Sequence, residues 1–487
     1  MSEKSKKIVL STILIIITLS IGIGIGLWQI NPPRVNNSSP NYPAYQRMME
    51  NIRLFTSIWP HPSGSEEIEA VRAMIIAEIE DMGLTPVIQE KLYSKDDILE
   101  YIFNLMNVAS ADELWEQYGE MAIKQLDIHS FDQLMDELFS TVASLEDGET
   151  MSIQNILVKI DSPTSDKGIM FMAHYDSEIN TPGAADAMVG VCAILEAMRK
   201  YVNNDNLESD LYFLLTDGEE VALLGANAFI EINPELKDKI DLVINFEARG
   251  NRGGLLLFET SPDAYSLMRA VRKAGSKPIG MSWLVAIYKM MPNDTDLTLF
   301  LNDGYNGINF AVTGGVEHYH MPTDSYENLD RNSAWQYLHT ALSLADYAAN
   351  NPTTTFNQPS REVVFFNILS FLVLMSAATS NFLCAIICLA ALILLIKRIK
   401  AKSLKVFPAV GIILLLILSV VTAIVFTAGN YLFYIPLLCA IIIEFFREKK
   451  TVLIISRVLS GIIVLLLWVP TIAILWMLLV TPMLVMG

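Results

Sequence analysis

The sequence predicts two parts of different kinds: an α/β domain with a mixed, largely parallel sheet between helices, and an all-α transmembrane bundle. Three observations predict this division. The chain of 487 residues is 52% hydrophobic, and its mean hydropathy of +0.39 is too high for one ordinary soluble domain. The apolar excess lies at the two ends of the chain. Between the ends, short apolar runs alternate with amphipathic segments, as strands and helices do in α/β folds.

The N-terminal segment is predicted to be a membrane anchor. Residues 8–28 carry no charge and have about the ~20-residue length that crosses a bilayer. Lysines at 4, 6 and 7 precede this run, which places residues 1–7 in the cytoplasm as a short tail and the chain after residue 30 outside. A cleaved secretory signal peptide is the alternative. We favour an anchor over residues 8–30, because the run is long for a signal and no small-residue cleavage site follows it.

Residues 31–355 are predicted to form the α/β domain. A polar, proline-rich linker opens it at residues 31–43, and residues 65–84 have apolar side chains at helical spacing. Buried strands are predicted at residues 155–160, 168–173, 211–216, 241–247 and 254–260, with helices at 189–201 and 222–230. Residues 94–147 interrupt the alternation with a wholly helical pattern, so we interpret them as a helical insertion that could form a lid or a platform.

The C-terminal residues 361–487 are predicted to form about five transmembrane helices. Basic breaks at residues 397–405 and 447–450 belong on the cytoplasmic side, which requires helical hairpins between and after them. The turns of these hairpins are predicted at residues 429–430 and 468–470. Few ionisable side chains lie within the apolar runs, which favours an anchor or bundle over a transport path.

Charge and cysteine content limit the possible functions. Residues 8–360 hold 49 acidic and 21 basic side chains, a net charge of −28. Such a field repels nucleic acid and attracts cations, although solubility alone would also account for it. The four cysteines are spaced for neither a disulfide framework nor a zinc ribbon.

Acidic and imidazole side chains follow successive predicted strands. His174 and Asp176 end one strand, and Asp186 lies in the loop after it; the later positions are Glu219, Glu220, Glu247, His318 and His320. Because ligands bind beyond the carboxyl ends of parallel strands, we expect these groups to share one edge of the sheet. Imidazole and carboxylate suit zinc, whose catalytic sites leave one position open.

Each of these residues also has a simpler interpretation. Asp186 could cap a helix, Glu219 and Glu220 could be first-turn helix charges, and Glu247 could pair with Arg249 or Arg252. A single histidine at a strand end is more often a structural residue than a ligand. Together the simple interpretations weaken, because so many acids on consecutive elements repel each other unless a cation lies between them.

The order of these motifs resembles that of the co-catalytic di-zinc aminopeptidases. This family includes bacterial leucyl aminopeptidase, aminopeptidase Y and the membrane-bound endoplasmic-reticulum metallopeptidases. The motifs run H-x-D, G-A-x-D, E-E, an acidic strand end and Y-H-x-P-x-D, and they cover residues 61–330. The segments "HPSGSEE" and "PNDTDLTLF" resemble the membrane-bound branch. The resemblance implies the zinc-peptidase fold.

The resemblance also implies a role for each residue. Asp186 would bridge two zinc ions, with His174 and Glu247 completing one site and Glu220 and His320 the other. Glu219 would be the general base, and Asp176 would orient the ring of His174. Two positions depart from the family: Ala187 follows the bridging aspartate, and Met321 follows the last histidine. His318 is expected to be a neighbour of the site, and Asp294 and Asp296 to be capping or hydrogen-bonding groups.

The implied activity is that of a multi-pass membrane aminopeptidase. It would use two zinc ions per chain to hydrolyse peptides with a free N-terminus, with its catalytic domain on the extracytoplasmic side of the lipid bilayer. A single-zinc acyltransferase similar to glutaminyl cyclase is one alternative. A receptor-like homologue without catalysis is the other, although such relatives lose ligands and here none is missing.

Overall fold

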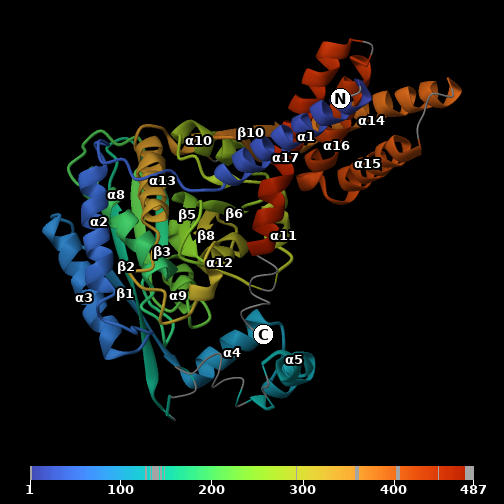
Figure 1. Ribbon diagram of the computed structural model, residues 1–487. Coiled ribbons are helices and arrows are strands. Elements are labelled where there is room, and N and C mark those ends of the chain that lie inside the picture. Colours follow the sequence, from blue (N-terminus) through green and yellow to red (C-terminus); the bar gives the residue numbers. More distant parts are fainter. Residues whose placement is uncertain are drawn as a thin grey trace. The chain divides into compact units, whose positions relative to one another are not determined.

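The computed structural model describes residues 3–126, 129–131, 133, 142, 145–146, 148–291, 293–356, 361–401, 406–447 and 449–477 (Figure 1). The chain folds as two compact units. The first, here called the membrane unit, comprises Met1–Pro33, Gly253–Pro292 and Gln358–Gly487; the second, the sheet unit, comprises Arg34–Arg252 and Asn293–Asn357. Residues 253–292, which the sequence assigns to the α/β domain, therefore group with the membrane helices.

Six strands of the mixed sheet lie in the sheet unit, in the order β1-β2-β4-β3-β5-β8. The four strands β4, β3, β5 and β8 are parallel neighbours, whereas β2 is antiparallel to both β1 and β4. Their bounds are β1 Val87–Ser94, β2 Thr150–Ile160, β3 Gly168–His174, β4 Asp210–Thr216, β5 Ile240–Ala248 and β8 Gly307–Val312. The predicted α/β class with a mixed, largely parallel sheet is confirmed.

Helices cover both faces of this sheet, as Figure 1 shows. On one face, α9 (Leu224–Ile232) and α12 (Asp296–Asn302) pack over a core that includes Met170, Met172 and Phe229. On the other face α8 (Val189–Tyr201) approaches so closely that a Cβ at Gly190 would lie 2.9 Å from Phe246 Cβ. Around α8 pack α2 (Tyr42–Phe55) and α13 (Arg331–Ala349), and α3 (Glu66–Asp81) lies beside α2. Burial on both faces explains why these strands are continuous apolar runs.

The described part of the predicted insertion is helical. The helices α4 (Lys95–Leu105) and α5 (Ala111–Leu126) lie between β1 and β2, and α4 begins with a capping box formed by Ser94 and Asp97. Ile98 and Ile102 pack against Tyr93, Met151 and Ile153. Most of residues 127–147 lies outside the described residues.

In the membrane unit, three helices are long and apolar enough to cross a membrane: Val9–Trp28, Ala377–Lys400 and Thr451–Leu475. They belong to α1 (Glu3–Trp28), α14 (Ala377–Lys400) and α17 (Lys450–Leu475). Two further helices, α15 (Val406–Val425) and α16 (Tyr431–Phe445), follow α14 in the sequence and precede α17. A turn separates α15 from α16 at Thr427–Gly429, close to the predicted position. The second predicted turn is wrong, because α17 continues through Pro470. The number of crossings stays a prediction.

The sequence is misleading at the start of the C-terminal region. Residues that we interpreted as part of a membrane helix form a hairpin of β9 (Val363–Ile368) and β10 (Phe371–Ser376). The unit also contains the parallel pair β6 (Leu256–Thr260) and β7 (Ile279–Gly280), with α10 (Tyr265–Ala274) and α11 (Ser282–Tyr288). Asn367 fixes the hairpin, because its carboxamide oxygen accepts a hydrogen bond of 2.6 Å from Gly280 N.

Two glycines of α1 permit its close contact with α17. A Cβ at Gly22 would lie 2.8 Å from Leu465 Cβ, and one at Gly26 would lie 2.8 Å from Val469 Cβ. A Cβ at Gly24 meets nothing within 4 Å. We expect Gly26→Val to destabilise the helix pair by about 1–3 kcal/mol through overpacking. Gly24→Val is the matched control. Thermal unfolding in detergent measures the difference, and equal midpoints for the two variants would contradict this packing.

Candidate metal centre

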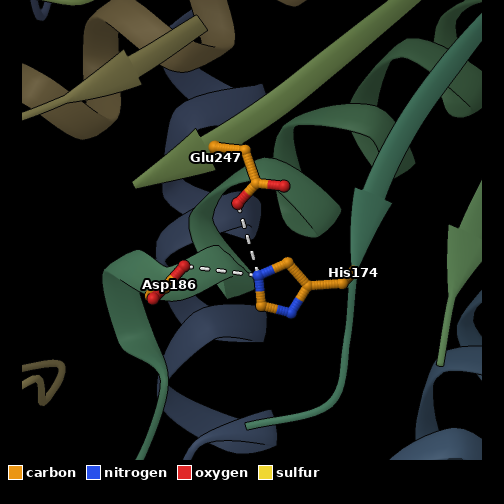
Figure 2. A group of neighbouring side chains, drawn as sticks. All are labelled: His174, Asp186 and Glu247. Atoms are coloured by element: carbon orange, nitrogen blue, oxygen red, sulfur yellow. Dashed lines mark hydrogen bonds and ion pairs between the residues drawn. The ribbon is translucent and has the colours of Figure 1, made fainter. Parts of the chain in front are cut away.

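His174 ends β3 and directs its two ring nitrogens at different groups. Its Nδ1 lies 3.1 Å from the main-chain oxygen and 3.4 Å from Oδ1 of Asp176. Its Nε2 lies 3.3 Å from Asp186 Oδ1 and 3.5 Å from Glu247 Oε2, the arrangement in Figure 2. A proton on Nδ1, donated to Asp176, would leave the Nε2 lone pair facing two carboxylates. This is how a partner behind the ring prepares a histidine to bind metal.

Asp186 lies between two histidines. Its Oδ1 faces His174, and its Oδ2 lies 3.5 Å from His320 Nε2. The residue sits in the irregular turn Ala184–Met188, and its peptide bond to Ala187 is cis. The helix α8 begins only at Val189, so Asp186 does not cap it. Its two oxygens therefore face the two halves of the site, as a bridging ligand would.

The pair Glu219 and Glu220 follows β4 but precedes α9, which begins at Leu224. The two residues are therefore not first-turn helix charges. Their backbone N–H groups donate to Oδ1 and Oδ2 of Asp176, both at 3.2 Å. Asp176 thus holds the ring of His174 and the backbone of both glutamates in one frame. The side chain of Glu220, 8% exposed, points its Oε2 at His320 Nε2 at 3.1 Å.

Glu247 ends β5 and also belongs to the cluster. Its Oε1 accepts a hydrogen bond of 3.0 Å from Asn245 Nδ2. The two arginines that could have paired with it are engaged elsewhere, because Arg252 pairs with Glu317 and Arg249 lies over the ring of Tyr319. The alternative of a simple ion pair for Glu247 therefore fails.

The last loop brings His320 into the site, whereas His318 belongs to none of the potential metal-binding groups among the described residues. His320 has a left-handed backbone with φ of 55°, a conformation seldom adopted by residues other than glycine. Its ring stacks on Tyr319 with 3.7 Å between centroids. Among the described residues, the groups whose ligand atoms lie within 4.8 Å of one another combine His174, Asp186 and Glu247, then His174, Glu219 and Glu220, and finally Glu178, Glu220 and His320.

The side chains of these groups do not satisfy one another's hydrogen-bonding capacity, and their donor atoms are of the kinds that bind metal ions. Oε1 of Glu220 is buried without a hydrogen-bond partner among the described residues, although Oε2 of the same carboxylate faces His320. An unpaired buried acceptor of this kind is costly unless a cation binds it. Imidazole nitrogen and carboxylate oxygen are the donors that zinc takes in catalytic sites. The roles assigned to the individual residues stay predictions.

The pKa shifts in the cluster also indicate that it needs a cation. Burial raises the pKa of Glu220, Asp296 and Asp324 each to about 7. Burial and then the charge of Glu247 raise the pKa of Glu219 well above its usual range. For His320 burial favours the neutral ring, but the charges of Glu220 and Asp186 prevail and raise its pKa to about 11. Without a metal, protons must therefore neutralise the site.

A pH dependence follows for the protein treated with a chelator. The pKa of Glu220 is near 4.5 when unfolded and about 7 when folded, so its contribution to stability is present below pH 4.5 and lost as the pH rises through 7. Asp296 and Asp324 act in the same direction. We expect the thermal unfolding midpoint to fall between pH 4.5 and 7.5 with chelator, and zinc to restore it at pH 7.5. A midpoint that rises over this range without metal would contradict this account.

Several buried residues around the site were not predicted from the sequence. Asp324 accepts hydrogen bonds from the backbone N–H groups of Ala185 and Asp186 at 3.0 and 3.1 Å, which fixes the loop of Asp186. Arg72 of α3 lies 3.3 Å from Asp217, and Ser63 donates to both Asp217 and Asp176 at 2.7 and 3.3 Å. The signal for Asp324 was present in the Y-H-x-P-x-D motif, whereas nothing in the sequence pairs Arg72 with Asp217.

For Asp296 the expectation of a hydrogen-bonding group is confirmed. It is the first residue of α12 and is fully buried, and its Oδ2 accepts a hydrogen bond of 2.5 Å from Thr216 Oγ1. Thr295, not Asp294, precedes the helix as its cap. Asp296 therefore brings a further buried carboxyl group close to His174 and Glu247 from a second element.

Comparisons with known proteins agree with the order of the motifs. Residues 155–345 match the model of Peptidase family M28. A vacuolar membrane protease of Lachancea thermotolerans is 28% identical over 280 residues, which cover 56% of this chain and 28% of that protein. A vacuolar membrane protease of Eremothecium gossypii is 30% identical over 268 residues, which cover 53% of this chain and 25% of that protein. The chain thus spans about a quarter of the length of these relatives. The resemblance indicated by the motifs is confirmed.

Solved structures with similar folds include an aminopeptidase from Aneurinibacillus sp. strain AM-1. It is 15% identical with a TM-score of 0.47, and the match covers 63% of this chain and 94% of that one. A glutaminyl cyclase from Porphyromonas gingivalis is also 15% identical with a TM-score of 0.43, and the match covers 62% of this chain and 97% of that one. The membrane proteases and the long apolar helices together support association of this chain with a membrane.

Proposed function

From residues 155–345, which carry the sequence pattern of peptidase family M28, we propose that this chain is a membrane-anchored zinc aminopeptidase. It would bind two zinc ions and hydrolyse the N-terminal bond of peptides. The observation that carries the proposal is Asp186, whose two oxygens face His174 on one side and His320 on the other. Glu247 completes the first set of donors and Glu220 the second.

Zinc held by these residues supplies Lewis acidity, because it polarises a carbonyl and lowers the pKa of water. The chain contributes the proton transfers. Glu219 takes a proton from the attacking water and gives it to the leaving amine, a step that suits a carboxylate whose pKa is raised by burial. Asp176 keeps Glu219 in place, because Oδ1 of Asp176 accepts a hydrogen bond from the backbone N–H of Glu219.

The requirement for a free N-terminus is supported by Glu178. This half-buried residue lies beside Glu220 and His320, and its Oε2 accepts a hydrogen bond of 2.7 Å from Ile179 N. The buried hydroxyl of Ser177, which accepts from His61 N at 3.0 Å, fixes the same loop. A carboxylate in this place attracts a protonated amine, and an amide would not be attracted in the same way.

The catalytic domain is proposed to lie on the extracytoplasmic side. Lysines precede the first span, and Lys397, Arg398 and Lys400 occupy the last turn of α14. Both basic groups belong in the cytoplasm, which leaves the start of α14 on the opposite side.

Paired assays test the proposed function. Purified protein with zinc is given the same short peptides with a free and an acetylated N-terminus. Hydrolysis of the free peptides alone, with a smaller preference in Glu178→Gln, is the expected result. Equal cleavage of both forms would overturn the aminopeptidase assignment. Cyclisation of N-terminal glutamine without peptide hydrolysis would favour the cyclase alternative.

A further inference from the structure

A group of cations occupies one side of α10 in the membrane unit. Arg269, Arg272 and Lys273 are all exposed, and their spacing of three and four residues places them on one helix face. The opposite face is buried through Leu267, Met268, Ala270 and Val271. We call the three side chains the basic face of α10.

This face is unusual in so acidic a chain. Residues 253–292 hold five basic and two acidic side chains, a net charge of +3, whereas residues 8–360 as a whole carry −28. Across the described part of the chain, no acidic side chain forms an ion pair with the three cations. Interaction with the helix dipole accounts for Arg272 and Lys273 in the last turn, at roughly 0.3–1 kcal/mol each. It does not account for Arg269.

The position of α10 indicates which anion it meets. The helix packs on β10, and β10 ends at Ser376, whose side chain caps the membrane span α14 by accepting from Thr379 N at 3.1 Å. At the other end of the hairpin, Leu369 N donates to Gln29 Oε1 at 3.0 Å, and Gln29 Nε2 donates to Leu466 O at 2.6 Å. The hairpin is therefore tied to the end of α1 and to α17 as well.

Two exposed aromatic side chains lie close to Gln29 and Leu369 in the sequence. Trp28 closes the first membrane span and is 59% exposed, and Phe371 at the start of β10 is 75% exposed. Tryptophan is enriched where a protein meets the boundary between lipid and water. One six-residue strand, about 20 Å long, separates this hairpin tip from the entry of α14. The basic face thus lies within reach of the headgroup layer.

We propose that the basic face of α10 binds the phosphate groups of anionic phospholipids in the bilayer that anchors the chain. Charge complementarity and the direct continuity of β10 with α14 select this ligand over others. Basic side chains near a membrane surface contribute about 1 kcal/mol each, which is roughly a fivefold change in affinity. The inference does not depend on the peptidase activity.

Native mass spectrometry of the full-length protein in detergent tests this proposal. Phosphatidylglycerol and phosphatidylcholine are titrated onto wild type and onto Arg269→Gln/Arg272→Gln/Lys273→Gln. We expect the triple variant to lose affinity for phosphatidylglycerol by about a hundredfold at low salt, with no change for phosphatidylcholine. Arg269→Lys/Arg272→Lys keeps the charge and is expected to bind as wild type does.

The control Arg53→Gln/Lys200→Gln/Lys237→Gln removes three cations that already pair with Glu50, Asp346 and Asp303. It should keep the affinity of wild type. An equal loss in this control would overturn the proposal, as would an unchanged triple variant with a normal unfolding midpoint. Inorganic phosphate or an acidic peptide that binds the basic face as tightly as phosphatidylglycerol would also overturn it, in favour of a soluble ligand.

Discussion

Glu219→Gln is expected to lower kcat for peptides with a free N-terminus by roughly 10²–10⁴, the contribution of a general base. The substitution keeps the shape of the side chain but removes its ability to accept a proton. Glu219 is not one of the proposed zinc ligands, and the backbone N–H that Asp176 accepts is unchanged. The zinc content of the variant should therefore equal that of wild type.

The measurement combines steady-state kinetics with metal analysis of the same samples. Glu235→Gln is the matched control, because Glu235 is exposed in the turn Pro234–Leu236 before β5, at the opposite end of that strand from Glu247. Retained activity in Glu219→Gln would remove this residue from the mechanism. Loss of activity together with loss of zinc would make it a ligand instead.

Asp186→Asn is expected to abolish activity and to release zinc from both sites. The carboxamide of asparagine carries no negative charge to offset two zinc ions. Its oxygen is an acceptor but its nitrogen is a donor, so it cannot bind both ions as the two carboxylate oxygens of Asp186 would. The loss of zinc affinity should exceed the roughly 10–100-fold typical of residues that only orient ligands. Zinc content after dialysis against a weak chelator measures the effect.

Asp324→Asn provides the comparison for Asp186→Asn. The side chain of Asp324 accepts hydrogen bonds from the backbone of the Asp186 loop, and the amide oxygen of asparagine can still accept one of them. We expect a loss of zinc affinity within 10–100-fold and partial activity. Zinc binding by Asp186→Asn that is no weaker than that of Asp324→Asn would contradict the bridging role.

Much of the sheet could be predicted because its central strands are buried on both faces. The strands that end at His174 and Thr216 are apolar from residue 169 to 173 and from residue 211 to 215, and each is followed by a helix. The strand Ile240–Ala248 is buried along its whole length. The strand β1 was not predicted, because as the outermost strand it exposes half of its residues, and its sequence VIQEKLYS has three consecutive polar residues and no continuous apolar run. The short run GINFAV of β8 was also missed, although glycines bound it on both sides.

The hairpin β9–β10 shows where an apolar pattern fails. Its fourteen residues are nearly as apolar as the helix that follows, and short apolar runs do not distinguish a strand from a helix. The decisive features lie outside the segment, since Asn367 pairs with Gly280 and Ser282 donates to Phe365 O. These contacts join residues more than 80 positions apart, which no local pattern reveals.

More of the residues of the candidate site than of the surrounding contacts could be predicted from the sequence. Neighbouring parallel strands end at one edge, so that side chains following β3, β4 and β5 had to meet there. His320 joins from a loop, and its place depended on the resemblance rather than on periodicity. The second layer of Arg72, Asp217 and Ser63 was beyond the sequence, because it is assembled from α3, the chain before it and the end of β4.

The most direct test of the proposed two-zinc site is crystallographic: diffraction from the protein soaked in zinc, recorded on both sides of the zinc absorption edge. We expect two anomalous peaks roughly 3.5–4 Å apart, both bound to Asp186, one also to His174 and Glu247 and the other to Glu220 and His320. A single peak, or peaks that do not contact Asp186, would contradict this proposal.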